Sequence, residues 1–203
     1  AVLPAFPGGA YTFEGRQAQQ ADSVGGLARG FAVALLLIFA LLAIPLRSYV
    51  QPLIIMSAIP FGLVGAIWGH IVMGLDVTLI SMFGLVALTG VVVNDSLVMV
   101  DFINRKLERF GDVQTAVREA GVARFRPILL TSLTTFAGLA PLMVNQSFQA
   151  AFLVPMAVSL AFGVLFATFI TLALVPVAYL ILDDAKRAMR RLAGRSPEPV
   201  PAT

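Results

Sequence analysis

The sequence has no cysteine, one histidine and one tryptophan among its 203 residues. Without cysteine the chain can form neither a disulfide framework nor a thiolate site. With His70 as the lone histidine, a metal site is not expected either. Charged residues make up only 12% of the chain, whereas 59% of residues are hydrophobic. This composition is far from that of a soluble globular domain and indicates a membrane protein.

The net charge of +3 does not point to nucleic acid, because the basic residues fall between apolar runs instead of forming one arm or stripe. No nucleic-acid partner is expected, and the bilayer is the expected surroundings. The chain begins Ala1-Val2-Leu3-Pro4, without methionine or a visible signal peptide. We interpret the sequence as a piece of a longer protein.

Five apolar runs are long enough to cross a bilayer, since a spanning helix needs about 20 mostly apolar residues. They cover residues 27–46, 53–73, 77–102, 127–144 and 152–182. The expected fold is therefore an all-α membrane protein with five transmembrane helices within residues 25–182.

The link between the third and fourth runs carries an amphipathic pattern. Asp112 has the character of an N-cap, and Val113, Ala116, Val117 and Ala120 recur at helical spacing. This pattern predicts a short cytoplasmic surface helix over residues 112–123. A plain connector and a coupling role are both open for this helix.

The distribution of lysine and arginine predicts the orientation, because basic loops are retained in the cytoplasm. If the spans alternate, 12 of the 14 basic residues fall on one side. Residues 1–24 are then extracytoplasmic and the tail 183–203 cytoplasmic. The tail ends in a Pro-rich polar stretch that cannot bury apolar surface, which predicts disorder.

A polar cluster interrupts the third run, where Asn94, Asp95 and Ser96 lie side by side. A charge at bilayer depth costs roughly 2.5–3.5 kcal/mol even on the lenient insertion scale. Loss of hydration favours the protonated form of a carboxyl at that depth. Asp95 is therefore a candidate for binding and releasing protons. The alternative is that it stays neutral and hydrogen-bonds a neighbouring helix.

Further polar side chains could serve the same relay or simply pack. Asp101 shares a helical face with Asn94, but it lies near the cytoplasmic end, where an interfacial charge is the simpler interpretation. Four hydroxyl residues begin the fourth run: Thr131, Ser132, Thr134 and Thr135. They either bond to carbonyls of their own helix, which is their common use, or line a wet path.

The second run carries small residues and one titratable ring. Gly65 and Gly69 lie four residues apart, which predicts close approach to a neighbouring helix. Trp68 suits an interfacial aromatic belt, and His70 is expected to be a hydrogen-bonded interface histidine rather than a proton carrier.

Two long motifs carry a family resemblance. The run Gly90-Val-Val-Val-Asn-Asp-Ser-Leu-Val-Met-Val-Asp-Phe-Ile-Asn-Arg105, followed by Arg124-Phe-Arg-Pro-Ile-Leu-Leu-Thr-Ser-Leu-Thr134, resembles the resistance-nodulation-division (RND) efflux permeases, hydrophobe/amphiphile exporter branch. Pro60-Phe-Gly-Leu-Val-Gly65-Ala and Tyr11-Thr-Phe-Glu14-Gly fit the same pattern. The resemblance implies the eighth to twelfth helices of a twelve-helix permease, with residues 1–24 as the end of a periplasmic porter-type segment.

The resemblance also implies a function. Such permeases are multidrug efflux pumps: secondary active transporters rather than enzymes, which use the proton motive force and no cofactor. They act as homotrimers in the inner membrane of Gram-negative bacteria, as proton antiporters for small hydrophobic or amphiphilic substrates. A periplasmic adaptor and an outer-membrane channel complete the tripartite system.

In that family two aspartates on the fourth helix, absent from this chain, pair with a lysine on the tenth helix and a threonine on the eleventh. Thr131 matches the threonine, but Asn94 stands where the lysine is expected, next to Asp95. Either Asp95 carries protons itself, or the relay is assembled differently, or coupling is altered. The proton-coupling residues predicted here are Asp95, Asn94, Ser96 and Thr131.

The same sequence features also fit a second function. Related helices occur in RND-type accessory modules for protein export or envelope assembly, which differ in having small periplasmic domains. An intramembrane enzyme has no support, because Ser96 beside an acid is not a nucleophile with a base.

Overall fold

The computed structural model describes residues 16–145 and 147–192. Its contacts divide the chain into two units, residues 1–36 and 37–203. The described part of the first unit is the beginning of helix α1 (Arg16–Leu46), and the second unit holds the end of α1 and all later helices. These are α2 (Val50–Met56), α3 (Ile59–Met73), α4 (Leu79–Phe110), α5 (Val113–Val144), α6 (Phe148–Ala151) and α7 (Val154–Leu192).

Five stretches of helix in the described part of the chain are long and apolar enough to cross a membrane. They cover Gln19–Leu46, Val50–Met73, Leu79–Phe110, Val113–Val144 and Val154–Met189. The predicted all-α membrane fold is confirmed. Residues 1–15 of the predicted N-terminal segment lie outside the described residues, and residues 16–24 begin α1.

The second predicted span is broken in two, a feature that the hydropathy pattern does not predict. α2 ends at Met56 and α3 begins at Ile59, with Pro60 in its first turn. Proline has no backbone N–H and cannot continue the ladder of the preceding helix. The Ser57 hydroxyl donates to the Ile54 carbonyl at 2.6 Å, which satisfies one of the carbonyls freed at the break.

Local capping explains where α3 ends and α4 begins. Gly74 adopts φ 64°, a left-handed conformation that ends α3 and that glycine adopts without steric cost. Four residues later the Thr78 hydroxyl accepts from the Ser81 N–H, and the Ser81 hydroxyl accepts from the Thr78 N–H. This reciprocal capping box fixes the start of the helix that carries the polar cluster.

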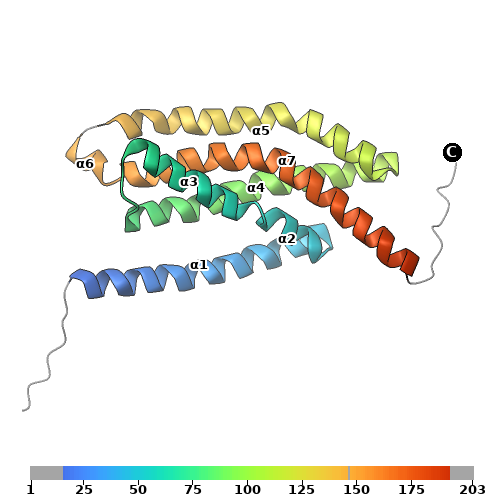
Figure 1. Cartoon of the computed structure of the whole chain (residues 1–203), viewed down its shortest axis with the longest axis horizontal. Coiled ribbons are helices and arrows are strands. Elements are labelled where there is room, and N and C mark those ends of the chain that lie inside the picture. The colour runs from blue at the N-terminus through green and yellow to red at the C-terminus, as the bar shows by residue number, and fades with distance from the viewer. Residues whose placement is uncertain (1–15, 146, 193–203) are drawn as a thin grey trace, which may run out of the picture. The chain divides into compact units, whose positions relative to one another are not determined.

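The predicted separation of a surface helix over 112–123 from a span over 127–144 is wrong, because α5 runs without interruption from Val113 to Val144. Figure 1 shows it as one long, bent helix. No helix-breaking residue lies between the two predicted pieces, and the Arg124 guanidinium lies 4.4 Å from the centre of the Phe102 ring on α4. Pro127 is accommodated inside the helix, as prolines in spanning helices often are.

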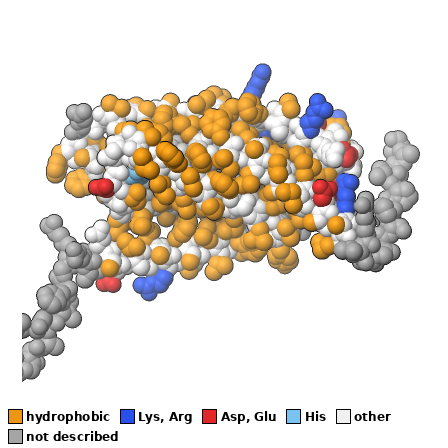
Figure 2. Space-filling model, viewed as in Figure 1, with side chains coloured by type: hydrophobic (Ala, Val, Ile, Leu, Met, Phe, Trp, Pro, Cys, Tyr) orange, Lys and Arg blue, Asp and Glu red, His pale blue; other side chains and the backbone are white. Residues whose placement is uncertain are grey.

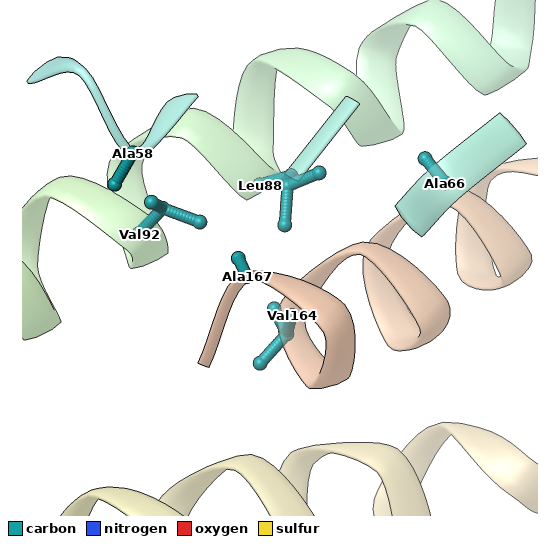
Figure 3. Close-up of a cluster of buried hydrophobic side chains, with 6 residues drawn as sticks. All are labelled: Ala58, Ala66, Leu88, Val92, Val164 and Ala167. Carbon is teal, nitrogen blue, oxygen red and sulfur yellow. The ribbon is translucent and has the colours of Figure 1, made fainter. Parts of the chain in front are cut away.

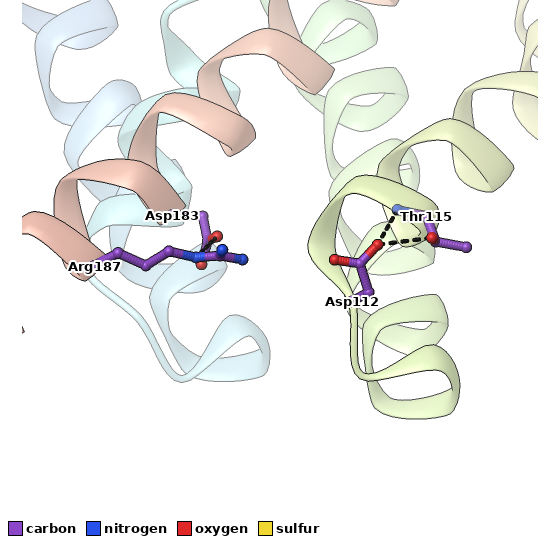
Figure 4. A network of polar contacts seen from close by, with 4 residues as sticks. All are labelled: Asp112, Thr115, Asp183 and Arg187. Carbon is purple, nitrogen blue, oxygen red and sulfur yellow. Dashed lines mark hydrogen bonds and ion pairs between the residues drawn. The ribbon is translucent and has the colours of Figure 1, made fainter. Parts of the chain in front are cut away.

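The N-cap within this prediction is confirmed. The Asp112 carboxylate accepts from the Thr115 N–H at 2.8 Å and from the Thr115 hydroxyl at 2.7 Å (Figure 4). The hydroxyl first, and then the backbone N–H, lower the pKa of Asp112 below its ordinary value. Asp112 therefore caps α5 in its ionised form.

The predicted disorder of residues 183–203 is wrong for its first part, because α7 continues to Leu192. Asp183 and Arg187, one helical turn apart, form an ion pair of 2.7 Å (Figure 4). Such pairs stabilise exposed helices, and the alanines and lysine around them are good helix formers. Residues 193–203 lie outside the described part.

The core of the second unit lies between α3, α4 and α7. Figure 3 shows side chains from these three helices, and Ala58 from the link before α3, converging on one cluster. Its buried members are Ala58, Ala66, Leu88, Val92, Val164 and Ala167. Methyl groups added at Gly65 and Gly69 would collide with Phe166 and Phe162 of α7, so the predicted close approach at these glycines is confirmed.

The outer surface of this unit is apolar. Figure 2 shows hydrophobic side chains over most of the visible face, with charged side chains around its margins. Large exposed residues include Ile71 at 64%, Leu130 at 64% and Phe169 at 62%. An apolar surface of this extent suits contact with lipid or with further helices and does not suit water.

Candidate functional site: a polar layer across α4, α5 and α7

The predicted polar cluster lies in the middle of α4, but its three side chains do not converge. Successive residues of a helix are rotated by about 100°, so neighbours in sequence face different directions. Asn94 is exposed, Asp95 is half-buried and Ser96 is fully buried. The Ser96 hydroxyl has no hydrogen-bond partner among the described residues. Asp95 is the only ionisable residue of the three, and it faces another helix.

Asp95 borders a narrow crevice between α4 and α7. The α7 side of this crevice is formed by Val164, Ala167, Thr168 and Thr171. The empty space at this crevice amounts to about 180 Å³, part of it open to the outside, and no water molecule fits between its walls. On the side that faces the crevice, the carboxyl therefore depends on protein groups for hydrogen bonds.

The register between α4 and α7 places Asp95 against the two threonines. The helices are parallel, and three independent contacts join residues 75 positions apart: Gly84 with Ser159, Leu88 with Gly163, and Asn104 with Tyr179. The same offset sets Asp95 level with position 170. It therefore lies between Thr168 and Thr171, within about 3 Å of each along the helix axis, although no hydrogen bond joins the carboxyl to either threonine in the described structure.

The register between α4 and α5 brings in the fourth predicted span. The two helices are antiparallel, and they meet where Lys106 lies 4.0 Å from Glu119 and where Arg124 covers the ring of Phe102. Continuing this register sets Asn94 level with Thr131 and Ser132. The positions that the family resemblance pairs therefore lie at one level of the bundle, although no hydrogen bond joins Asn94 to Thr131 in the described structure.

The four hydroxyls of α5 divide into two kinds. Thr131, Thr134 and Thr135 donate to carbonyls of their own helix, the common use considered above. Ser132 is buried and also shares a hydrogen bond with the Thr168 hydroxyl of α7. Ser132 thus joins α5 to the helix that faces Asp95.

We call the residues at this level the polar layer: Asn94 and Asp95 of α4, Thr131 and Ser132 of α5, and Thr168 and Thr171 of α7. The sequence analysis missed the two α7 threonines. Their signal was present, since both are polar residues three positions apart inside a long apolar run, but only the helix register relates them to Asp95.

Asp101 lies outside the polar layer. Its carboxylate pairs with Arg105, one turn later on α4, at 2.8 Å, and both side chains are well exposed, at 43% and 74%. This geometry is that of an ordinary helical ion pair and suits the interfacial interpretation of Asp101.

Two further polar contacts hold the helices around the layer. His70 is buried, with Nδ1 3.0 Å from the Ala66 carbonyl oxygen and Nε2 2.8 Å from the Ser81 hydroxyl, so both ring nitrogens have partners. The Gln51 and Asn104 amides form two reciprocal hydrogen bonds, and the Tyr179 hydroxyl donates to Asn104 at 2.7 Å. The second network joins α2, α4 and α7, and the sequence analysis did not identify it.

No cluster of three or more histidine or acidic side chains that could hold a metal ion occurs within residues 16–145 and 147–192. The expectation that the protein needs no cofactor stays a prediction.

The spans and the polar layer between them define a membrane protein with several transmembrane helices. The sequence pattern of the AcrB/AcrD/AcrF family matches residues 3–183. The multidrug resistance protein MdtC of Pantoea ananatis (strain AJ13355) is 31% identical over 191 residues, covering 93% of this chain and 18% of that protein. MdtC of Proteus mirabilis (strain HI4320) is 31% identical over 155 residues, covering 76% of this chain and 15% of that protein.

Solved structures of an efflux pump also match the fold of this chain. A crystal structure of a heavy metal efflux pump, in crystal form II, matches with a TM-score of 0.75 at 26% identity, covering 86% of this chain and 18% of that chain. Crystal form I matches with a TM-score of 0.74 at 28% identity, covering 83% and 17%. The chain belongs to the AcrB/AcrD/AcrF family of RND permeases, and it spans less than a fifth of the length of these relatives.

Proposed function

We propose that this chain is the C-terminal membrane part of a proton-driven efflux pump, in which Asp95 binds and releases the coupling proton. The observation that carries the proposal is a half-buried carboxyl in the middle of a spanning helix, beside a crevice too narrow for water. An acid in that position is costly when ionised and has no packing role that an apolar residue could not fill. We therefore propose that this carboxyl has a functional role, the binding of the coupling proton.

The driving force is sufficient for such a task. A proton that crosses a membrane potential releases about 2.3 kcal/mol per 100 mV. If protonation of Asp95 changes how α4 packs on α7, that energy biases the bundle between two states. Asp95 borders the contact between these two long helices, so a change at its carboxyl acts directly on their packing.

Asn94 and Thr131 are proposed to face the missing half of the transporter. Both side chains are exposed in this chain and lie at the level of Asp95. An exposed amide inside a spanning helix is costly against lipid, which favours a protein partner there. In the resembled family that partner is the fourth helix with its two aspartates. Ser96, which faces the opposite way, contributes to the buried side of α4.

The substrates are proposed to be small hydrophobic or amphiphilic compounds, and the relatives named multidrug resistance proteins support drugs as the substrate class. The titles of the structural relatives favour heavy metal ions as a second candidate. Export assays of the complete protein with a cationic dye and with a soft metal ion separate the two classes.

The proposed setting is a homotrimer in the Gram-negative inner membrane, working with a periplasmic adaptor and an outer-membrane channel. We propose that residue 1 lies on the periplasmic side and the C-terminus in the cytoplasm.

The test is Asp95→Asn in the complete protein, which keeps the size of the side chain and removes its ability to ionise. We expect export to fall to the background of cells without the pump, at unchanged abundance in the membrane. Asp76→Asn, in the exposed turn before α4, is the matched control and should export normally. Export by Asp95→Asn at the wild-type rate would refute the proposal.

A companion variant examines the α5 side. Thr131→Ala removes a hydroxyl that otherwise bonds only to its own helix in this chain. If the hydroxyl faces the missing half, export should weaken severalfold and lose part of its dependence on the proton gradient. Full proton coupling in this variant would remove Thr131 from the relay.

A further inference from the structure

We propose that Thr168 and Thr171 are the hydrogen-bond partners of the Asp95 carboxyl, and that Thr168 transmits its protonation state to α5 through Ser132. This inference rests on the proposed function, because it specifies the surroundings of the same carboxyl. It assigns a positioning role to α7, which the sequence analysis left as an apolar span.

On the crevice side, Asp95 has few other partners. Apart from Asp95 and the two threonines, the walls of the crevice are formed by Val91, Val92, Val164 and Ala167, whose side chains are all apolar. Water does not fit. The two threonine hydroxyls are therefore the only side-chain hydrogen-bonding groups that the lining of this crevice offers to the carboxyl.

The Thr168 hydroxyl also belongs to a group of three hydrogen-bond contacts that share only two hydroxyl protons. Thr168 Oγ1 lies 2.8 Å from the Val164 carbonyl oxygen, Ser132 Oγ lies 3.0 Å from the Ile128 carbonyl oxygen, and the two hydroxyls contact each other. Each hydroxyl carries a single proton. Two protons can serve only two of these three contacts at once, so the hydrogen bond between Ser132 and Thr168 can run in either direction.

The protonation state of Asp95 selects the direction. An ionised carboxylate only accepts, so Thr168 turns its proton toward Asp95 and Ser132 donates to Thr168, leaving the Ile128 carbonyl without that donor. A protonated Asp95 donates to Thr168, which then donates to Ser132, and Ser132 donates to the Ile128 carbonyl. No proton leaves either hydroxyl in this exchange. The result is a hydrogen bond on α5 that forms when Asp95 is protonated and is lost when Asp95 is ionised.

Other ionisable groups stand apart from this crevice. On the helices that pack against α4, the ionisable side chains that the structure describes are His70 on α3, Arg118, Glu119, Arg124 and Arg126 on α5, and Tyr179, Asp183, Asp184, Lys186 and Arg187 on α7. None of them lines the crevice. On α4 itself, Asp101 is paired with Arg105. A change in pH dependence caused by the threonines would therefore report on Asp95.

The test uses the pH profile of export by the complete protein. Thr168→Val and Thr171→Val keep the shape of the side chain and remove the hydroxyl. Hydrogen bonds to a charged acceptor are stronger than those to a neutral one, so each loss should shift the midpoint of the profile upward, by about one pH unit. Thr168→Ser restores a hydroxyl and should restore the wild-type midpoint.

The control is Thr89→Val on α4, because Thr89 is equally buried but donates to the Leu85 carbonyl and does not line the crevice. If Thr168→Val lowers membrane abundance, Ser132→Ala repeats the test from α5. The inference would be overturned if the midpoints of the crevice variants equalled that of Thr89→Val. In that case the proposed function would still stand, provided that Asp95→Asn abolishes export. Normal export by Asp95→Asn would instead refute the proposed function.

Discussion

A close contact of α4 with α7 at Gly84 gives a stability prediction that depends on one missing methyl group. A Cβ added at Gly84 would lie 2.5 Å from the Met156 carbonyl oxygen and 2.8 Å from the Ser159 Cβ. Neither neighbour is the flexible end of a long side chain, so neither can rotate away. Gly84→Ala therefore forces the two helices apart near the start of α4.

The size of the effect follows from the distances. Ordinary van der Waals contact begins near 3.4 Å, so the helices must separate by about 0.9 Å at this point. Overpacking of this kind costs about 1–3 kcal/mol. Alanine also gains about 1 kcal/mol of helix propensity over glycine, which would partly mask the loss. Gly90→Ala on the same helix gains the same propensity, and its Cβ would meet nothing within 4 Å among the described residues.

The comparison of these two variants isolates the packing cost. In the purified complete protein, the thermal unfolding midpoint of Gly84→Ala should lie below that of the wild type, and that of Gly90→Ala should equal or exceed it. Equal midpoints for the two alanine variants would show that α4 and α7 do not pack as closely as described.

Three further predictions concern hydrogen bonds elsewhere in the helices that form the polar layer. Ser81→Ala removes the Nε2 partner of His70 and half of the capping box of α4, and it should destabilise the protein by about 1–3 kcal/mol, measured by thermal unfolding. Tyr179→Phe removes the hydrogen bond to Asn104 and should cost about 1 kcal/mol in the same assay, and an unchanged midpoint would contradict the network. Because its pKa is lowered in the folded state, the Asp112 carboxylate stabilises α5 fully above the ordinary value of 3.8 and loses this effect as pH falls through the lowered value. Asp112→Ala should therefore be less stable than the wild type at neutral pH, and the difference should shrink in strong acid; a difference that does not change with pH would refute the role of the charge.

Much of the fold could be predicted because the bilayer restricts the alternatives. Runs of about 20 apolar residues can only form spanning helices, so the number and order of the spans follow from hydropathy. The break before Pro60 and the continuity through Pro127 could not be predicted in the same way. Both prolines look alike in the sequence, and what distinguishes them is the packing around each one.

The candidate site could be predicted only in part. Asp95 was recognised because a single acid in an apolar run is costly, whatever its surroundings. Thr168 was missed because hydroxyls are common and inexpensive in spanning helices, where they usually bond to their own backbone. Its relation to Asp95 depends on the constant offset of 75 positions between α4 and α7. A single sequence contains no record of such a register.

The central claim is that the Asp95 carboxyl changes its protonation state, and infrared difference spectroscopy of the complete, membrane-embedded protein tests it most directly. A step in pH across the active range should produce a carbonyl band of a protonated carboxylic acid that is present in the wild type and absent from Asp95→Asn. Identical difference spectra for the two proteins, at a pH where the wild type exports, would contradict the account.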